Sequence, residues 1–394
     1  MIGISKLYCG TVEPSDALRY GRHSKALPSH LLQFSADKKP VVVWNCTQAC
    51  NLRCMHCYAQ AGCQQAAGEL SHAEGRALID DLADFGAPVL LFSGGEPLCR
   101  ADMPDLAAYA VSKGMRAVIS TNGTLITDAV AQRLKGIGLS YVGISLDGMQ
   151  ATNDHFRGQD GAYVKVLEGI RACQRVGLKV GLRYTITRHN VHDLPGIFDL
   201  LEAENIPRVC FYHMVYSGRA ADMASADLSH AQTRETLDYI IDRTAALHAR
   251  GFAKEVLTVD NHCDGPYIYL RLLREGRTDD AARVMQLLEM NGGNSSGHGI
   301  GCVSWDGTVY PDQFLRETPL GNVRETPFSE IWSNADNPLL AALRDKPAHV
   351  TGKCQTCRFL GVCGGNFRAR ALAATGDFWG VDPACYLSDE EIGS

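Results

Sequence analysis

Six short apolar runs, each followed by a segment of helical character, constrain the fold of this chain more than any other feature. The runs cover residues 41–44, 89–92, 116–119, 141–146, 179–185 and 208–214. The helical segments cover residues 71–85, 104–113, 128–137, 163–176, 191–203 and 229–249. Strands that alternate with helices in this way build βαβ units around a parallel sheet. The sequence therefore predicts an α/β fold. Six units favour a partial (β/α)6 barrel, with an open sheet as the alternative.

The chain is long enough for one large domain and a smaller appendage. Three parts are predicted: an irregular N-terminal extension over residues 1–39, the barrel over 40–253, and a turn-rich region over 254–394. The last part contains a predicted hairpin over 304–309, with Asp306 and Gly307 as a two-residue turn. A helix is predicted over 328–343. In either α/β arrangement, reactive residues should lie at the C-terminal ends of the strands.

Charge and hydropathy exclude two kinds of partner. The formal net charge is −6, and the chain has no basic run of the kind that follows a phosphate backbone, so nucleic acid is excluded. No apolar stretch approaches the roughly 18 residues that a membrane-spanning helix needs. The N-terminus also lacks the pattern of a secretory signal, so we expect a cytoplasmic protein.

The chain has 15 cysteines, which in a reducing compartment indicate metal or redox chemistry rather than disulfides. Cys50, Cys54 and Cys57 form a C-x3-C-x2-C group directly after the first strand. Three thiolates are one fewer than close an ordinary [4Fe–4S] cluster. They leave one iron open to chelate the amino and carboxylate groups of S-adenosylmethionine (SAM). The alternative is a zinc knuckle or a closed cluster with His56 as fourth ligand.

This cysteine group, followed by Tyr58, resembles that of the radical SAM superfamily. Three more motifs follow successive strands as in that superfamily: Ser93-Gly-Gly-Glu-Pro97, Ser120-Thr-Asn-Gly123 and Ser145-Leu-Asp-Gly148. The resemblance implies that the three cysteines hold a catalytic [4Fe–4S] cluster at which SAM is cleaved to a 5′-deoxyadenosyl radical. It also implies SAM contacts from Tyr58, Gly94, Gly95, Glu96, Ser120, Asn122, Ser145, Asp147 and Arg183. Glycines are expected in the second motif because the backbone must come close to the ligand.

A second cysteine group resembles the SPASM or twitch-like extension of that superfamily. It contains Cys354, Cys357, Cys363 and Cys385, which the resemblance makes ligands of one auxiliary [4Fe–4S] cluster. The family's other auxiliary cluster lacks two ligands here, because Phe367 and Asp312 stand at cysteine positions and Cys302 is left without partners. The expectation is therefore a small C-terminal iron–sulfur domain with one cluster, and a zinc ribbon is the alternative.

The N-terminal segment and most of the chain resemble the tetrapyrrole-modifying branch of the superfamily. AhbC-type members of that branch remove the two acetate side chains of 12,18-didecarboxysirohaem, in the alternative haem biosynthesis route, and give Fe-coproporphyrin III. NirJ-type members remove propionates from a related ring. The resemblance is closer to the first type. It implies a tetrapyrrole substrate, anaerobic metabolism and an electron donor such as flavodoxin or ferredoxin, and we expect a monomer.

Such a substrate carries carboxylates and iron, which arginine and histidine bind well. Arg157 and Arg219, with Arg183, are therefore candidate anchors, and His213 at the end of the sixth strand is a candidate iron ligand. Tyr20 and Arg22 are candidates to cap the pocket. Two other functions are considered: a peptide-modifying SPASM enzyme and a non-catalytic iron–sulfur carrier. The three SAM motifs disfavour the carrier, because a carrier has no need of SAM.

Overall fold

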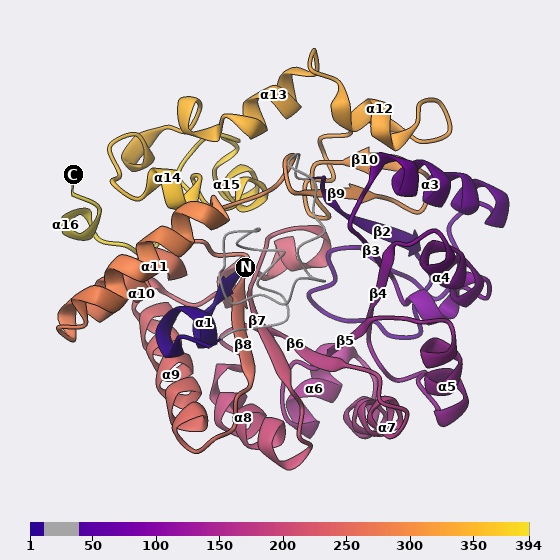
Figure 1. Cartoon of the computed structure of the whole chain (residues 1–394), viewed down its shortest axis with the longest axis horizontal. Coiled ribbons are helices and arrows are strands. Elements are labelled where there is room, and N and C mark those ends of the chain that lie inside the picture. Colours follow the sequence, from indigo (N-terminus) through magenta and orange to yellow (C-terminus); the bar gives the residue numbers. More distant parts are fainter. Residues whose placement is uncertain (12–38, 394) are drawn as a thin grey trace.

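The protein, described by a computed structural model over residues 1–11 and 39–393, is built on one mixed sheet of 11 strands. The strand order is β1-β8-β7-β6-β5-β4-β3-β2-β9-β10-β11. Figure 1 shows the central strands in an arc, with the helices α3 to α9 on its outer side and the C-terminal elements along the remaining side. The two edge strands do not pair with each other, so the barrel is incomplete, as predicted.

The six predicted strands are confirmed. They are β2 (Val41–Thr47), β3 (Val89–Gly94), β4 (Arg116–Thr121), β5 (Tyr141–Ser145), β6 (Val180–Ile186) and β7 (Arg208–His213). Each pairs in parallel with the next. In β2 every residue after Val41 is buried, which is typical of a parallel sheet covered on both faces.

The sheet extends beyond these six strands at both edges. A seventh parallel strand, β8 (Glu255–Val259), pairs with β7, and β1 (Ile2–Gly3) lies antiparallel to β8. At the other edge, β9 (Ile300–Val303) pairs in parallel with β2, followed by β10 (Thr308–Tyr310) and β11 (Gly321–Asn322). The sheet therefore crosses both predicted domain boundaries, and the division of the chain into three parts stays a prediction.

The outer helices are α3 (His72–Phe85), α4 (Met103–Ser112), α5 (Asp128–Gly136), α6 (Gln150–Arg157), α7 (Ala162–Arg175), α8 (Leu194–Ala203) and α9 (His230–Ala249). Ser71 and Glu74 form the capping box that begins α3. The short helix α6 was not predicted, because most of its residues are polar. In the described part of the chain there are also 3-10 helices at Pro97–Cys99, Val191–Asp193, Gly218–Ala226, Lys346–Ala348 and Gly352–Cys354.

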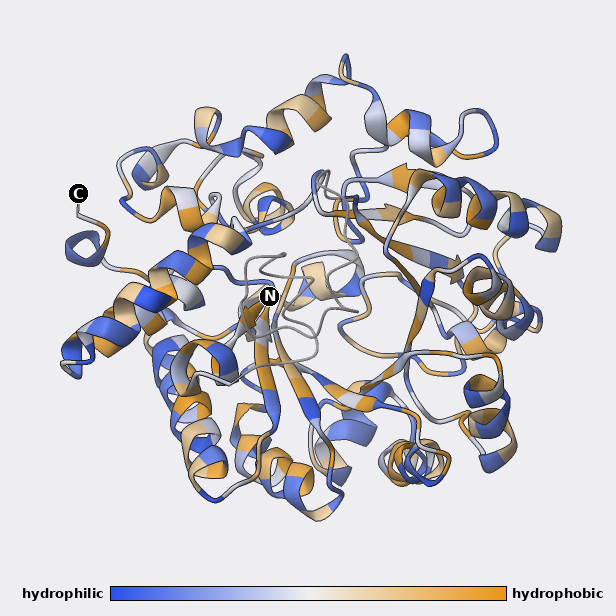
Figure 2. Cartoon of the chain, viewed as in Figure 1, coloured by the Kyte–Doolittle hydropathy of each residue, from blue (hydrophilic) through white to orange (hydrophobic). Residues whose placement is uncertain are grey.

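The core lies between the sheet and these helices, where Figure 2 shows hydrophobic residues along the strands and on one side of each long helix. Trp44 and Phe92, from adjacent strands, are fully buried with ring centroids 5.6 Å apart. Phe198 of α8 stacks on Phe211 of β7 at 5.6 Å. Such aromatic pairs contribute about 0.5–1.5 kcal/mol beyond the area that they bury. This packing fixes the strands whose ends carry the site.

The C-terminal region contains seven further helices: α10 (Asp264–Arg274), α11 (Thr278–Asn291), α12 (Phe328–Ser333), α13 (Pro338–Arg344), α14 (Leu360–Cys363), α15 (Arg368–Thr375) and α16 (Asp389–Ile392). The helix predicted over 328–343 is two helices, because Asn337 caps the second one and Pro338 opens it. The predicted hairpin exists as β9 and β10. Its turn spans 305–307 rather than two residues, since the Ser304 amide donates to the Thr308 carbonyl.

The N-terminal extension was predicted to be irregular, which is wrong for its first residues. After β1, the helix α1 (Ile4–Cys9) ends at Gly10, whose positive φ of 76° suits glycine. This segment is buried against β8 and α9. Tyr20 and Arg22 lie outside the described residues. No helix in the described part of the chain combines the length and the apolar character that a bilayer span requires.

Candidate active site

The loop after β2 carries Cys50, Cys54 and Cys57. Two backbone hydrogen bonds close it: the Cys50 amide donates to the Gly62 carbonyl at 2.6 Å, and the Gly62 amide donates to the Gln48 carbonyl at 3.2 Å. Burial, with smaller contributions from Glu96 and the other two cysteines, raises the pKa of Cys50 to about 12. A thiol of this kind loses its proton when a metal centre binds it. Three such sulfurs in one small loop fit the predicted cluster.

Arg219, in the loop after β7, supports the cysteine loop from outside. Its amide donates to the Cys57 carbonyl at 3.0 Å, and its guanidinium donates to the carbonyls of Cys54 at 2.8 Å and Ala61 at 3.0 Å. Gly218 beside it has no room for a side chain, because a Cβ atom would lie 2.6 Å from the Cys57 carbonyl oxygen. These carbonyls bind Nε and Nη1, whereas Nη2 is buried with no hydrogen-bond partner among the described residues. The substrate contact predicted for Arg219 therefore stays a prediction.

The side chain of Arg157, in α6, also contacts the cysteine loop rather than a substrate pocket. It is buried, its Nη1 atom lies 3.5 Å from the Cys54 sulfur, and it forms an ion pair with Asp147. His56 Nε2 lies 3.1 Å from the same carboxylate, which also accepts from the Thr185 amide at 2.7 Å. Burial alone would raise the pKa of Asp147, but Arg157 and His56 outweigh it and hold the pKa at about 2. The predicted substrate contact of Arg157 is corrected for this reason.

Glu96, in the second motif, is fully buried and organises the ends of β3 and β4. Its carboxylate accepts from the Thr121 hydroxyl at 2.7 Å, the Asn122 amide at 2.7 Å and the Leu98 amide at 3.0 Å. Burial raises its pKa, and these three hydrogen bonds oppose that rise. Through these three donors Glu96 holds the ends of β3 and β4 together, and its predicted contact with SAM stays a prediction.

Gly94 and Gly95 are required by the protein's own backbone. A Cβ atom on Gly94 would lie 2.4 Å from the Thr47 carbonyl oxygen, and one on Gly95 would lie 2.2 Å from the Ala49 carbonyl oxygen. The Gly95 amide also donates to the Thr47 carbonyl at 2.8 Å. The structure thus gives its own reason for these glycines, and the predicted close approach to a ligand stays a prediction. They allow the second motif to pack directly on the start of the cysteine loop.

The third motif joins the cysteine loop through Asn122. Its Nδ2 atom donates to Asn51 Oδ1 at 2.8 Å and lies 3.9 Å from the Cys50 sulfur. Three other residues that are predicted to contact SAM differ from Asn122: Ser120, Ser145 and Arg183. In the part of the chain that the structure describes, their side chains have no hydrogen-bond or ion-pair partner. These three side chains are therefore available to a ligand.

Tyr58 connects the cysteine loop to the C-terminal region. Its hydroxyl donates to Asn45 Oδ1 at 2.9 Å and lies 3.0 Å from the Ser93 hydroxyl, and burial raises its pKa. Its ring packs edge-on against Phe314, with centroids 5.3 Å apart. Asn45 in turn donates to the Cys302 sulfur at 3.5 Å. The ring of Tyr58 is thus fixed between the barrel and the chain after β10.

The second cysteine group forms a separate site. A small cavity is lined by the four predicted ligands Cys354, Cys357, Cys363 and Cys385. Its wall also includes Cys263, which the sequence analysis did not place there. Within residues 1–11 and 39–393, no three His, Cys, Asp or Glu side chains converge on a single metal ion. Four thiols that line one cavity match the ligand set of an iron–sulfur cluster.

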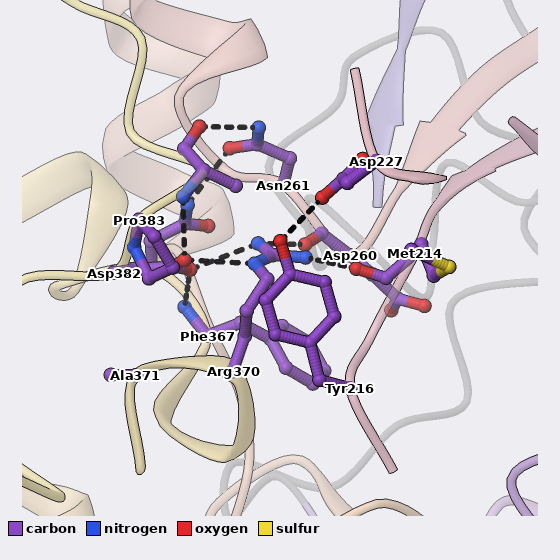
Figure 3. Close-up of polar contacts among 12 residues, drawn as sticks. Met214, Tyr216, Asp227, Asp260, Asn261, Phe367, Arg370, Ala371, Asp382 and Pro383 are labelled. Atoms are coloured by element: carbon purple, nitrogen blue, oxygen red, sulfur yellow. Dashed lines mark hydrogen bonds and ion pairs between the residues drawn. The ribbon is translucent and has the colours of Figure 1, made fainter. Parts of the chain in front are cut away.

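Arg370 of α15 joins this cavity to the barrel (Figure 3). Its guanidinium forms a two-pronged ion pair with Asp382, which lines the cavity, at 2.8 and 2.9 Å. It also donates to the carbonyls of Met214 at 2.9 Å and Asp260 at 2.8 Å. These two residues directly follow β7 and β8. The wall of the auxiliary site is therefore tied to two strand ends of the barrel.

Aromatic packing occupies the region where the family's other auxiliary cluster would lie. Phe367, at a missing cysteine position, packs against Phe314 with ring centroids 5.6 Å apart. Asp312, at the other missing position, is buried and accepts from the amides of Phe314 at 2.7 Å and Leu315 at 2.9 Å. Both residues have structural partners, which agrees with the prediction of one auxiliary cluster.

His213, at the end of β7, is hydrogen-bonded rather than free. Its Nε2 atom lies 2.9 Å from Asp264 Oδ2, and the Tyr386 hydroxyl donates to the other oxygen of that carboxylate at 2.7 Å. Burial alone would lower the pKa of His213, but the Asp264 carboxylate outweighs it and raises the pKa. Iron ligation by His213 would therefore use Nδ1.

The arrangement of one three-cysteine loop with an open side, three motifs at successive strand ends and a separate multi-cysteine cavity defines a radical SAM enzyme with an auxiliary cluster. Comparison with known proteins agrees, because residues 44–201 match the radical SAM superfamily and residues 298–358 match SPASM, an iron–sulfur cluster-binding domain. The chain belongs to the radical SAM superfamily, and within it to the tetrapyrrole-modifying branch. Its cofactors are SAM, a [4Fe–4S] cluster and an auxiliary iron–sulfur cluster.

Two relatives and one solved structure show the range of this similarity. The chain is 63% identical over 397 residues to the Fe-coproporphyrin III synthase of Methanosarcina barkeri, covering 100% of this chain and 99% of the relative. It is 43% identical over 357 residues to the pre-heme d1 synthase of Dinoroseobacter shibae, covering 90% and 88%. The structure of Streptococcus suis SuiB bound to its precursor peptide has a TM-score of 0.69 at 18% identity, covering 89% and 76%, and shows the shared fold alone.

Proposed function

We propose that this enzyme removes the two acetate side chains of 12,18-didecarboxysirohaem, leaving methyl groups, and gives Fe-coproporphyrin III in the alternative haem biosynthesis route. The observation that carries the proposal is the 63% identity to an Fe-coproporphyrin III synthase, because it extends over the whole chain, including both cysteine groups. SAM bound beside the first cluster would supply the 5′-deoxyadenosyl radical that takes a hydrogen atom from the side chain.

The residues left unpaired near the strand ends support a substrate with carboxylates. The guanidinium of Arg183 lies 4.9 Å from the Tyr212 ring and has no carboxylate partner among the described residues. An arginine in this state suits the carboxylate of SAM or of the substrate. Asp260, at the end of β8, is buried, and burial raises its pKa to about 6 despite the charge of Arg370. The strand ends thus offer both a fixed cation and a carboxyl group able to exchange a proton near neutral pH.

His213 is the residue that we propose as a ligand of the substrate iron. Because Asp264 holds Nε2, the ring orientation is fixed and Nδ1 is the nitrogen left for a ligand. We further propose a cytoplasmic, anaerobic enzyme that acts as a monomer and takes electrons from a flavodoxin or ferredoxin.

A second candidate is the NirJ-type removal of propionate side chains, which the 43% identity to a pre-heme d1 synthase favours. The two candidates share the radical chemistry and differ in which side chain lies beside the 5′ carbon of SAM. The peptide-modifying alternative rests on the shared fold, because the SuiB similarity is at 18% identity.

The test is an anaerobic assay of the reconstituted, reduced enzyme with SAM and 12,18-didecarboxysirohaem, analysed by mass spectrometry. We expect loss of both acetate groups together with 5′-deoxyadenosine. Formation of 5′-deoxyadenosine with an unchanged tetrapyrrole would overturn the acetate reaction, and the same assay with propionate-bearing precursors would then test the second candidate.

A further inference from the structure

The hairpin formed by β9 and β10 turns one face toward the inside of the barrel. Cys302 of β9 lies opposite Tyr310 of β10, and Asn45 of β2 donates to the Cys302 sulfur at 3.5 Å. Trp44, the neighbour of Asn45, packs on the other face against the outer helix α3. Because successive side chains of a strand point to opposite faces, Asn45, Cys302 and Tyr310 share the inner face. Asn45 also accepts from the Tyr58 hydroxyl, so this inner face adjoins the cysteine loop.

Arg316 lies across this inner face. Its guanidinium carbon is 4.5 Å from the centroid of the Trp305 ring and 5.9 Å from that of Tyr310, and its Nη2 atom donates to the Ser304 hydroxyl at 3.3 Å. The backbone before Arg316 is fixed, because the buried carboxylate of Asp312 accepts from two amides of the segment between them. A guanidinium held against aromatic rings in this way is already oriented for a ligand.

The guanidinium of Arg316 lacks an acceptor of matching charge. Its Nη1 atom is buried without a hydrogen-bond partner, and no carboxylate within residues 1–11 and 39–393 forms an ion pair with it. By contrast Arg324, which follows the same hairpin, is paired with Glu74. Buried donors are paired with few exceptions, so the missing partner of Arg316 is an anion from outside these residues.

The state of Arg316 differs from that of other arginines with a buried, unpartnered nitrogen. Each of those arginines binds a carboxylate or backbone carbonyls through its remaining nitrogens, whereas Arg316 binds only one hydroxyl. They are Arg157, Arg208, Arg219, Arg243 and Arg368.

We propose that Arg316 binds a carboxylate side chain of the tetrapyrrole through Nη1 and so determines which edge of the ring faces the cysteine loop. Carboxylates are the anions that a guanidinium binds best, and such a substrate carries several. The carboxylate of SAM is expected at the open iron of the first cluster, which leaves the substrate as the source. This inference rests on the proposed function and adds to it a residue that determines substrate orientation.

The test compares Arg316→Gln and Arg316→Lys with the wild type in the full-length, reconstituted enzyme. Glutamine removes the charge, whereas lysine keeps the charge and loses the planar fork. Arg76→Gln is the matched control, because Arg76 stacks on the Tyr109 ring at 3.6 Å among the outer helices. Binding of 12,18-didecarboxysirohaem is followed by its absorption spectrum and SAM binding by calorimetric titration. Iron per chain and thermal unfolding are measured for each variant, and the tetrapyrrole titration is repeated with its methyl ester.

We expect Arg316→Gln to weaken tetrapyrrole binding about tenfold or more, because a hydrogen bond between two charged groups is lost. Arg316→Lys should weaken it less, and Arg76→Gln should leave it unchanged. SAM affinity and iron content should stay at wild-type values in all three. With the methyl ester, the wild type should bind no better than Arg316→Gln, because the ester has no charged carboxylate for the guanidinium.

Equal affinity of the wild type and Arg316→Gln for the free acid would overturn the inference. Weaker SAM binding with unchanged tetrapyrrole binding would overturn it too, because the carboxylate would then be that of SAM. If Arg316→Gln unfolds early, Arg316→Lys decides in the same way: equal affinity contradicts the inference, and a loss that disappears with the ester supports it. A wild type that binds the tetrapyrrole without removing its acetates would overturn the proposed reaction alone, so the two failures are distinguishable.

Discussion

Arg370 and Asp382 form a two-pronged ion pair in which both side chains are 0% exposed. The remaining donors of Arg370 bind the carbonyls that follow β7 and β8. Asp382 also accepts hydrogen bonds from the amide of Phe367 and from the amide of Ala384, which directly precedes Cys385. The pair therefore fixes the distance between the strand ends of the barrel and the auxiliary cavity (Figure 3). That distance matters wherever an electron passes between the two sites.

Arg370→Gln should separate the two sites. Removing one partner of a buried pair leaves an uncompensated charge and costs about 3–5 kcal/mol. We expect a lower unfolding temperature and loss of the auxiliary iron, with the SAM-binding cluster retained. Arg175→Gln is the control, because its ion pair with Asp128 is exposed and should contribute about 0–1 kcal/mol. Calorimetry and iron analysis measure both effects. Equal stability of the two variants would contradict this role of Arg370.

Glu96→Gln should weaken SAM binding, because Glu96 organises the strand ends that carry the predicted SAM site. The carboxylate accepts hydrogen bonds from the Asn122 amide and the Thr121 hydroxyl. Glutamine would replace one of the accepting oxygens with an NH2 group, so that two donors would face each other. A buried clash of this kind costs about 1–3 kcal/mol. Because the same segment contacts Cys50 through Asn122, we expect a tenfold or larger loss of SAM affinity by calorimetric titration.

Asp105→Asn is the control for this change, since its ion pair with Arg133 is exposed. If Glu96→Gln bound SAM as tightly as the wild type, the motif around Glu96 would have no part in the site.

The strand pattern and the cysteine spacing were predictable because both are local. Period and length along the chain determine strands such as β2, and three thiolates within eight residues must face one small centre. The gathering of Cys354, Cys357 and Cys363 at one site was likewise readable from their spacing, and the structure places all three on one cavity. The seventh strand, β8, was missed because its five residues follow a long helix and resemble the start of a new region.

The partners of the polar side chains were not predictable, because they depend on contacts between distant segments. Arg157 and Arg219 were assigned to substrate from their places after strands, yet each is bound to the cysteine loop. Cys263 carried no motif, and only the fold brings it to the second cysteine group. The glycines at 94 and 95 were predicted correctly as tight positions, and the close contact that the structure shows is with the backbone of the chain after β2.

The two cluster sites should be separable by mutation. Replacing Cys50, Cys54 or Cys57 with alanine should abolish SAM cleavage, because the cleavage needs the open iron that these residues hold. Cys363→Ala should instead keep 5′-deoxyadenosine formation and lose the auxiliary signal in electron paramagnetic resonance. Chromatography of 5′-deoxyadenosine and iron analysis measure the two outcomes. SAM cleavage that survived Cys50→Ala would place the reaction elsewhere.

The pair of His213 and Asp264 should make stability depend on pH. The charged groups that face His213 are Asp264, Asp227 and Arg370, and despite burial and Arg370 the net effect raises its pKa above that of the unfolded chain. A raised histidine pKa contributes stability that is fully present below about pH 6.5 and is lost as the pH rises through the folded-state value.

His213→Gln removes the titrating group and keeps a hydrogen-bonding side chain. We therefore expect the wild type to lose stability relative to this variant as the pH rises above about 6.5, as measured by chemical unfolding at fixed salt. The pKa of Asp264 is lowered by His213 despite burial, so its own contribution is lost only in acid and does not enter this window. Parallel curves for the two proteins would mean that the ring is neutral in the fold. In that case Asp264 would hold His213 as a neutral hydrogen-bond partner, with no ion pair to lose.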